Sequence, residues 1–235
     1  MIRIVTAHQP NYLPWIGFFS KIKQSDCLII ADTVVMGDKS VFNRNKIRTN
    51  NGWVYLTIPI GHKALNRKIC DIKLPSDKTW QKNHWQTVYR NYAHTKFFKD
   101  YQDFFEELYQ RDFTYIWQLN LEIIKYLLKC FNIEVEMLKA SEMTIDQNLR
   151  STDFIIALMA GCGADIYLSG PSGRNYLNLK KFPQQNIGLK FFNFQHPVYQ
   201  QRYPGFEPDM SAIDLLFNMG PHAGDVISAS GSLED

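Results

Sequence analysis

The chain has 235 residues and a net charge of only +3, because 26 Lys and Arg residues oppose 23 Asp and Glu residues. Hydrophobic residues make up 45% of the chain and aromatic residues 14%, a composition that excludes collagen-like and disordered proteins. The small net charge also argues against a protein that coats nucleic acid. The length permits one large domain, and we expect a single domain over residues 1–235.

The four cysteines include no Cys-x-x-Cys pair, so we expect reduced structural thiols rather than a zinc site. The apolar run at residues 1–6 is too short for a signal peptide, and no stretch approaches the ~20 apolar residues of a membrane span. These features predict a cytoplasmic protein without a membrane span. No metal-ligand spacing and no dinucleotide-binding motif occurs, so no metal or other cofactor is expected.

The first predicted elements form a β-α-β unit. Residues 2–6 are β-branched and predict a strand, Pro14 opens a helix, and the apolar run 27–31 predicts a second, buried strand. Lys21 and Lys23 are expected on the helix face opposite its apolar side. A strand, a helix of about ten residues and another strand are typical of an α/β fold.

The middle of the chain contains an extended segment followed by a helical one. Residues 32–57 favour extended structure, with a turn signal at residues 50–52 that predicts a hairpin. Residues 69–74 alternate between apolar and polar side chains and predict a half-exposed strand. Aromatic residues then recur at helical spacing, which predicts a helical subdomain over residues 76–131.

The last third returns to alternating strands and helices. The pattern predicts strands at 133–138, 165–169 and 189–194 and helices at 154–159 and 211–219, followed by a frayed tail from residue 223. The predicted fold is therefore α/β, with a mixed, largely parallel sheet, helices on both faces and an inserted α-helical lobe.

Polar residues follow several predicted strands. His8, Asp32, Ser169 and His196 would meet at one edge of a parallel sheet, where α/β proteins bind ligands. His8 is the candidate general base, Asp32 would orient its ring, and His196 is a second candidate catalytic residue. The alternatives are structural: a His8 or Asp32 that caps a turn and a His196 that stacks on an aromatic ring. His62, His84, His94 and His222 are expected to be structural or solvated.

The densest basic segment includes Lys39 and residues 43–48. Arg44, Lys46 and Arg48 alternate, so on a strand they share a face that could hold a phosphorylated ligand, assisted by Asn43 and Asn45. The segment is too short for a duplex nucleic acid, which usually engages six or more phosphates. An edge strand protected by charge is the alternative.

Several segments resemble one protein family. They are HQPNYLPWIGFF at 8–19, Asp32, NRNKI at 43–47, YLSG at 167–170, HPVYQQ at 196–201 and SAIDLLFNMG at 211–220. In this order they resemble the WbqC-like family over nearly the whole chain. The resemblance implies a role beside the enzymes of bacterial surface-polysaccharide loci, such as those for O-antigen or capsule.

The residues and the resemblance together lead to two hypotheses. The first is a transferase that places an acyl or aminoacyl group on the amine of a nucleotide-linked amino sugar, with acyl carrier protein, coenzyme A or charged transfer RNA as donor. The second is a non-catalytic protein that binds sugar nucleotides or acts as a scaffold. The candidate binding residues beyond the basic segment are Gln9, Asn11, Trp15, Ser169, Gly170 and Tyr199.

Overall fold

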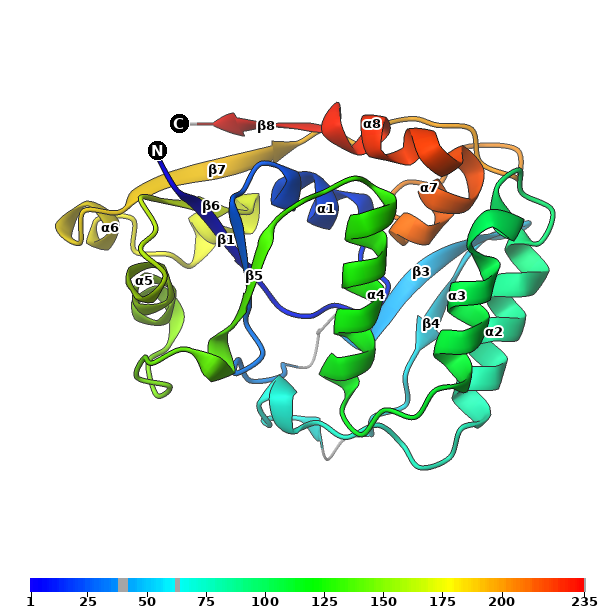
Figure 1. The fold of residues 1–235 in the computed structure, drawn as a ribbon, viewed down its shortest axis with the longest axis horizontal. Coiled ribbons are helices and arrows are strands. Elements are labelled where there is room, and N and C mark those ends of the chain that lie inside the picture. Colours follow the sequence, from blue (N-terminus) through cyan, green and yellow to red (C-terminus); the bar gives the residue numbers. More distant parts are fainter. Residues whose placement is uncertain (38–41, 62–63, 235) are drawn as a thin grey trace.

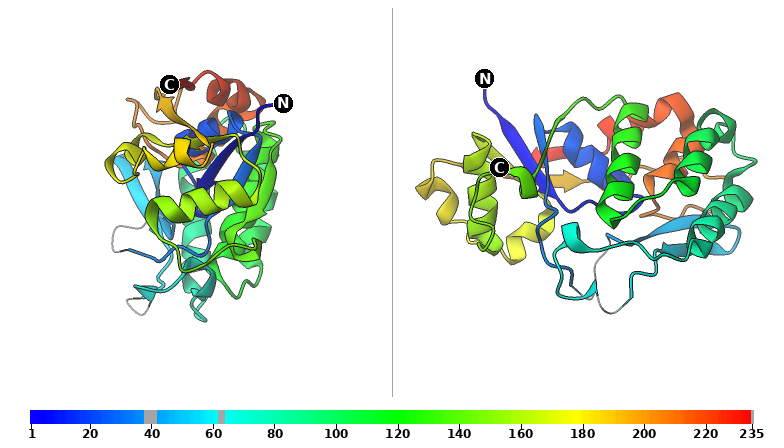
Figure 2. Two further views of the ribbon diagram at one scale, coloured as in Figure 1. Left: turned by 90° about the vertical axis from the view of Figure 1, so that its left-hand side faces the viewer. Right: turned by 60° about the horizontal axis from the view of Figure 1, so that its bottom comes forward.

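The structure, a computed structural model, describes residues 1–37, 42–61 and 64–234. Lys39 of the basic segment and His62 lie outside these described residues. Figures 1 and 2 show an elongated molecule, with α5 (Ser151–Gly161) and α6 (Lys181–Gln184) at one end and α2 (Thr79–Tyr92) and α3 (Phe98–Gln110) at the other.

A six-stranded sheet in the order β5-β2-β1-β6-β7-β8 organises the described part of the chain. Its strands are β1 (Ile4–His8), β2 (Cys27–Ile30), β5 (Glu136–Lys139), β6 (Ile166–Ser169), β7 (Gly188–Phe194) and β8 (Gly231–Glu234). The first five in spatial order run parallel, and only β8 pairs antiparallel, with β7. The predicted mixed, largely parallel α/β sheet is confirmed.

Buried side chains lie on both faces of the sheet because alternate residues of a strand point in opposite directions. In β2, Leu28 and Ile30 join the core that contains α1 (Ile16–Lys23), whereas Cys27 and Ile29 join the core that contains α5. The predicted β-α-β unit is also present, since β1 and β2 are parallel neighbours joined by α1.

The segment between β2 and β5 holds a separate hairpin and three helices. Strands β3 (Arg44–Thr49) and β4 (Gly52–Thr57) pair around the predicted turn, and α2, α3 and α4 (Ile116–Cys130) follow. These helices share a continuous core with α1 and α7 (Ala212–Met219). The prediction of a strand at 69–74 was wrong, because a 3₁₀ helix, η2 (Ile69–Asp71), stands there.

The C-terminal segment is ordered, so the prediction of a frayed tail from residue 223 was also wrong. Helix α8 (Ala223–Ser228) packs beside α1, and β8 then adds an antiparallel strand along β7. Short polar side chains made this segment look flexible. One of them, Ser230, contributes to the order of the segment, because its buried hydroxyl donates to the Ser20 hydroxyl of α1 at 2.9 Å.

A buried carboxylate ties the hairpin to α7. Asp214 is completely buried and accepts hydrogen bonds from the Tyr92 hydroxyl, the Tyr199 hydroxyl and the Gln201 amide at 2.9, 2.7 and 2.9 Å. Tyr92 in turn accepts the backbone N–H of Arg48 at 2.9 Å. Burial raises the pKa of the Asp214 carboxyl, and the three donated hydrogen bonds oppose that change.

His84 makes stability depend on pH. It is buried, its Nδ1 lies 2.9 Å from the Tyr12 hydroxyl, and burial lowers its pKa to about 4. An unfolded histidine takes up a proton near pH 6.5 and the folded one does not, so the free energy of unfolding falls as the pH drops from 6.5 toward 4. We expect His84 to contribute about 3 kcal/mol to this loss.

The measurement is urea unfolding of the wild type and of His84→Gln between pH 7 and 4. The variant should lose less stability over this interval than the wild type, and His94→Gln, which changes an exposed histidine, should match the wild type. Equal slopes in the wild type and His84→Gln would contradict the assignment.

Candidate functional site

The order of the strands places a binding crevice at the end of β1. From β1 the chain moves to β2 on one side, and it later adds β6 on the other side of β1. At such a reversal the loops that leave the two neighbouring strands diverge, which opens a crevice at their carboxyl ends. His8 ends β1, and Gly170 directly follows β6, so both stand at this crevice.

The loop between β1 and α1 is held from several sides. The Asn120 amide donates to the Pro10 carbonyl at 2.7 Å, the Tyr12 N–H donates to the Phe42 carbonyl at 2.9 Å, and the Ala212 N–H donates to the Pro14 carbonyl at 2.8 Å. Leu13 adopts a positive φ of 45°, which is unfavourable for this residue type. A strained backbone held by external hydrogen bonds is a common feature of ligand sites.

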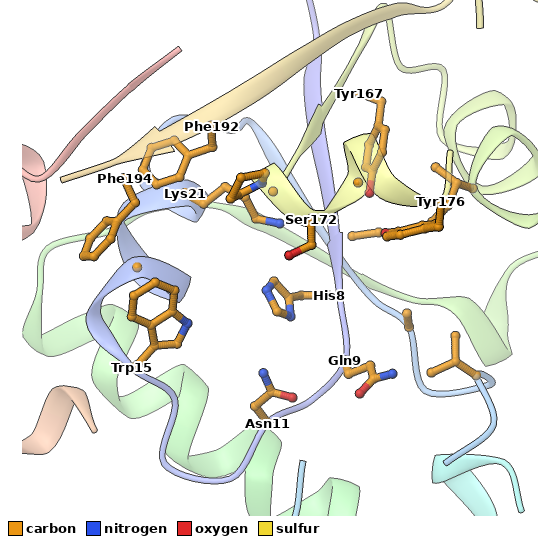
Figure 3. Close-up of a pocket in the computed structure, with 18 residues that line it drawn as sticks. His8, Gln9, Asn11, Trp15, Lys21, Tyr167, Ser172, Tyr176, Phe192 and Phe194 are labelled. Atoms are coloured by element: carbon orange, nitrogen blue, oxygen red, sulfur yellow. The ribbon is translucent and has the colours of Figure 1, made fainter. Parts of the chain in front are cut away.

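A cavity of about 460 Å³, which we call the main cavity because it holds the predicted site residues, opens over this loop and is shown in Figure 3. Its polar lining includes His8, Gln9, Asn11, Lys21 and Ser172, and Gly170 contributes backbone. Its aromatic lining residues are Trp15, Tyr167, Tyr176, Phe192 and Phe194. The predicted site residues His8, Gln9, Asn11, Trp15 and Gly170 therefore lie together.

A smaller side cavity, about 320 Å³, adjoins the main one. His8, Asn11 and Trp15 line both cavities, and the side cavity adds Arg44 and Lys46. Its remaining lining residues are Pro14, Asn45, Tyr55 and Asp209. The basic hairpin thus lies next to the β1 loop, and the two cavities together form a candidate site with two adjoining parts.

The two cations of the side cavity are supported by aromatic rings. The Arg44 guanidinium lies 5.0 Å from the centre of the Tyr55 ring, and the Lys46 ammonium lies 5.2 Å from the centre of the Trp53 ring. Such contacts hold a cation in place without neutralising it. No ion pair of Arg44 or Lys46 occurs within the described residues, so both charges are available to an anionic ligand.

The His8 ring is held as a neutral imidazole. It is half-buried, and its ring centre lies 4.6 Å from that of Phe18. Burial and the nearby charge of Lys21 lower its pKa well below 6.5. His8 is therefore a proton acceptor throughout the physiological pH range.

Asn11, which lines both cavities, has an unsatisfied polar atom. Its side chain is 5% exposed, and its Oδ1 is buried without a hydrogen-bond partner among the described residues. A buried amide oxygen without a partner costs stability, on the order of 1–3 kcal/mol. A hydroxyl or N–H group of a ligand would remove this cost.

The two other candidate catalytic residues have different partners. The Asp32 carboxylate accepts from the Ser141 N–H at 2.9 Å and from the Ser141 hydroxyl at 2.6 Å, so it ties β2 to the segment after β5 instead of orienting His8. The His196 Nε2 accepts from the Asp209 N–H at 2.9 Å, and its Nδ1 lies 2.9 Å from the Pro197 carbonyl. Both ring nitrogens of His196 are occupied, which favours the structural alternative.

Two predicted binding residues belong to the interior. Arg48 is 3% exposed, and its guanidinium donates to the carbonyls of Thr49, Gly52 and Pro204, each at 2.7 Å. Tyr199 is buried, with its hydroxyl on Asp214. The alternation of the three cations along β3 is real, but only Arg44 and Lys46 reach the side cavity.

Three more predicted residues position backbone. The Asn43 amide donates to the Ile58 carbonyl at 3.0 Å, and the Asn45 amide donates to the Leu13 carbonyl at 2.5 Å. Asn45 therefore fixes the strained residue of the β1 loop and also lines the side cavity. Ser169 is buried and does not line the main cavity, because its hydroxyl turns to the Gly170 carbonyl at 3.1 Å.

Sequence reasoning missed Lys21 as a site residue. The structure places its side chain in the main cavity at 5% exposure, whereas Lys23 is exposed as predicted. One signal was available: Lys21 stands four residues after Gly17, so the two share a helix face. Gly17 also has a packing reason, since the Trp15 ring occupies the space that its side chain would need.

The family profile described as the WbqC-like protein family matches residues 9–226, nearly the whole chain. The chain belongs to this family. This WbqC-like protein is also 28% identical over 221 residues to the "Uncharacterized protein Rv1507c" of Mycobacterium tuberculosis, an alignment that covers 93% of this chain and 95% of the other. No solved structure gives a significant match.

The family match includes both parts of the site, because the β1 loop after His8, the hairpin and the segment after β6 all fall within residues 9–226. In the described ranges of this WbqC-like protein, no group of three or more His, Cys, Asp or Glu side chains could hold a metal ion. None of the described helices is long and apolar enough to cross a membrane.

Proposed function

We propose that this protein transfers an acyl or aminoacyl group to the amine of a nucleotide-linked amino sugar, as a step of bacterial surface-polysaccharide biosynthesis. The observation that carries the proposal is the shared boundary of the two cavities. His8 and Asn11 stand between the cationic side cavity and the larger aromatic cavity, which suits a ligand with a phosphate end and a sugar end. Aromatic walls favour sugar rings and apolar acyl groups.

Different residues that line the cavities would bind the substrate and transfer the proton in such a reaction. Arg44 and Lys46 would hold the diphosphate, and the Trp15 ring would lie against the sugar. As the sugar amine attacks the acyl carbonyl, a C–N bond forms and the bond from the acyl carbon to its thioester sulfur or ester oxygen breaks. His8 would accept the proton that the amine loses and return it to the departing thiolate or alkoxide.

The test is a thermal-shift screen of nucleotide sugars, coenzyme A derivatives and RNA, followed by mass spectrometry of each stabilising nucleotide sugar after incubation with candidate donors. The expected result is a product heavier by one acyl or aminoacyl group. Stabilisation by a nucleotide sugar without turnover by acyl-coenzyme A, acyl carrier protein or charged transfer RNA would favour the non-catalytic alternative. One observation favours this alternative: Asp32 and His196, two of the three candidate catalytic residues, do not line either cavity.

The side cavity allows a direct check of the phosphate contact. Replacing Arg44 and Lys46 together with glutamine should weaken the binding of uridine diphosphate sugars about tenfold or more, because charge-assisted hydrogen bonds are lost. Isothermal titration calorimetry measures the change. The matched control is Lys96→Gln with Lys99→Gln, which removes the same charge from exposed positions near the start of α3. Equal losses in both double variants would mean that only net charge matters.

A further inference from the structure

Lys21 is a buried cation that the proposed reaction leaves without a role. It lies on α1 with 5% of its surface exposed, and it lines the main cavity. Figure 3 shows its ammonium directed toward the space between Ser172 and His8. The side chain thus ends inside the space that a ligand would fill.

Within the described residues, nothing neutralises this cation. No described carboxylate forms an ion pair with Lys21, and neither Asp nor Glu lines the main cavity. Burial lowers the pKa of Lys21 to about 8, so most molecules still carry the charge at pH 7. His8, whose pKa the charge of Lys21 helps to lower, is neutral and adds no negative charge. A buried charge of this kind is costly until an anion reaches it.

Asn11 adds a second, independent unmet requirement in the same cavity. Its buried Oδ1 requires a donor, whereas the Lys21 ammonium requires an acceptor with negative charge. The aromatic walls require a ring or another apolar body. A sugar ring with hydroxyl or amide groups and one acidic group meets all three requirements.

We propose that Lys21 binds a carboxylate of the ligand, so that the sugar in the main cavity is an aminated uronic acid. This inference rests on the proposed function for the nucleotide part of the ligand. A carboxylate is favoured over a phosphate because the main cavity offers one cation, which matches one negative charge. The side cavity offers two cations, Arg44 and Lys46, beside the single carboxylate of Asp209, so it has more cationic donors for a diphosphate.

A matched pair of probes tests the proposal. Uridine diphosphate N-acetylglucosamine and its C6-oxidised uronic acid differ only in the group CH₂OH or COO⁻. The wild type should bind the acid about tenfold or more tightly than the neutral sugar in calorimetry, since one charge-assisted hydrogen bond is gained. Lys21→Met should remove the preference, and Lys23→Met, two residues along the same helix and exposed, should keep it. Equal binding of the two sugars to the wild type, or a preference that survives in Lys21→Met, overturns the proposal.

A second measurement separates this proposal from the proposed function. The pKa of Lys21, followed by NMR of ¹³C-labelled lysine in the wild-type protein, should rise from about 8 when benzoate is added and stay unchanged with benzyl alcohol. If neither nucleotide sugar binds but benzoate raises this pKa, the proposed function fails and the carboxylate site stands. If the nucleotide sugars bind equally and benzoate has no effect, the carboxylate site fails and the proposed function stands. No binding and no effect overturn both.

Discussion

His8→Gln is expected to lower the rate of acyl transfer by a factor of about 10² to 10⁴, which is the usual contribution of a general base. Glutamine keeps the approximate size of the side chain and its hydrogen-bonding capacity, but it cannot accept a proton at neutral pH. Binding of the nucleotide sugar should therefore change little. The measurement is single-turnover kinetics beside calorimetry on the same preparations.

The pH dependence of the same reaction gives an independent check. Burial and Lys21 lower the pKa of His8 well below 6.5, so protonation of the base should inhibit the reaction only at pH values clearly below 6.5. The control is His94→Gln, which alters an exposed histidine and should match the wild type at every pH. Undiminished turnover in His8→Gln would exclude His8 as the base.

The second large effect concerns stability. Asp214→Ala should lower the free energy of unfolding by about 3–6 kcal/mol, because the Tyr92, Tyr199 and Gln201 donors lose a shared acceptor in the interior. The loss should exceed any gain from removing a carboxyl whose pKa burial already raises. Urea unfolding at pH 7 measures it.

The matched control for this change is Asp225→Ala on α8, where an exposed carboxylate is removed. We expect that substitution to change the unfolding free energy by no more than about 0.5 kcal/mol. A loss below about 1 kcal/mol in Asp214→Ala would show that the donors find other acceptors, and the network would then not be the link between the hairpin and α7.

Much of the fold could be predicted because local pattern and tertiary environment agree. The apolar run at 27–31 is buried on both faces as its composition requires, and the turn at 50–52 joins the two hairpin strands. The prediction of a strand at residues 69–74 was wrong because a short alternating pattern does not distinguish a strand from a 3₁₀ turn that buries the same side chains. The prediction of a frayed tail was wrong because the order of this segment comes from contacts with α1 and β7, which are distant in sequence.

The lining of the candidate site could be predicted where position along a strand decides it. His8 and Gly170 follow from the rule that parallel strands deliver their carboxyl ends to one edge. Asp32, His196 and Arg48 have the residue types of a site, but the direction of each side chain depends on partners such as Ser141, Asp209 and Pro204, which only the folded structure brings near. Lys21 was not predicted as a site residue because a lysine on a helix usually faces water.

The hydrogen bonds that hold the β1 loop have a consequence for the thermodynamics of recognition. A backbone already fixed by Asn120, Phe42 and Ala212 has little conformational entropy left to lose when a ligand enters. The free-energy cost of ordering the β1 loop, which includes the positive φ of Leu13, is part of the free energy of folding. Most of the contact energy at this loop is therefore available to discriminate between ligands of different shape and charge.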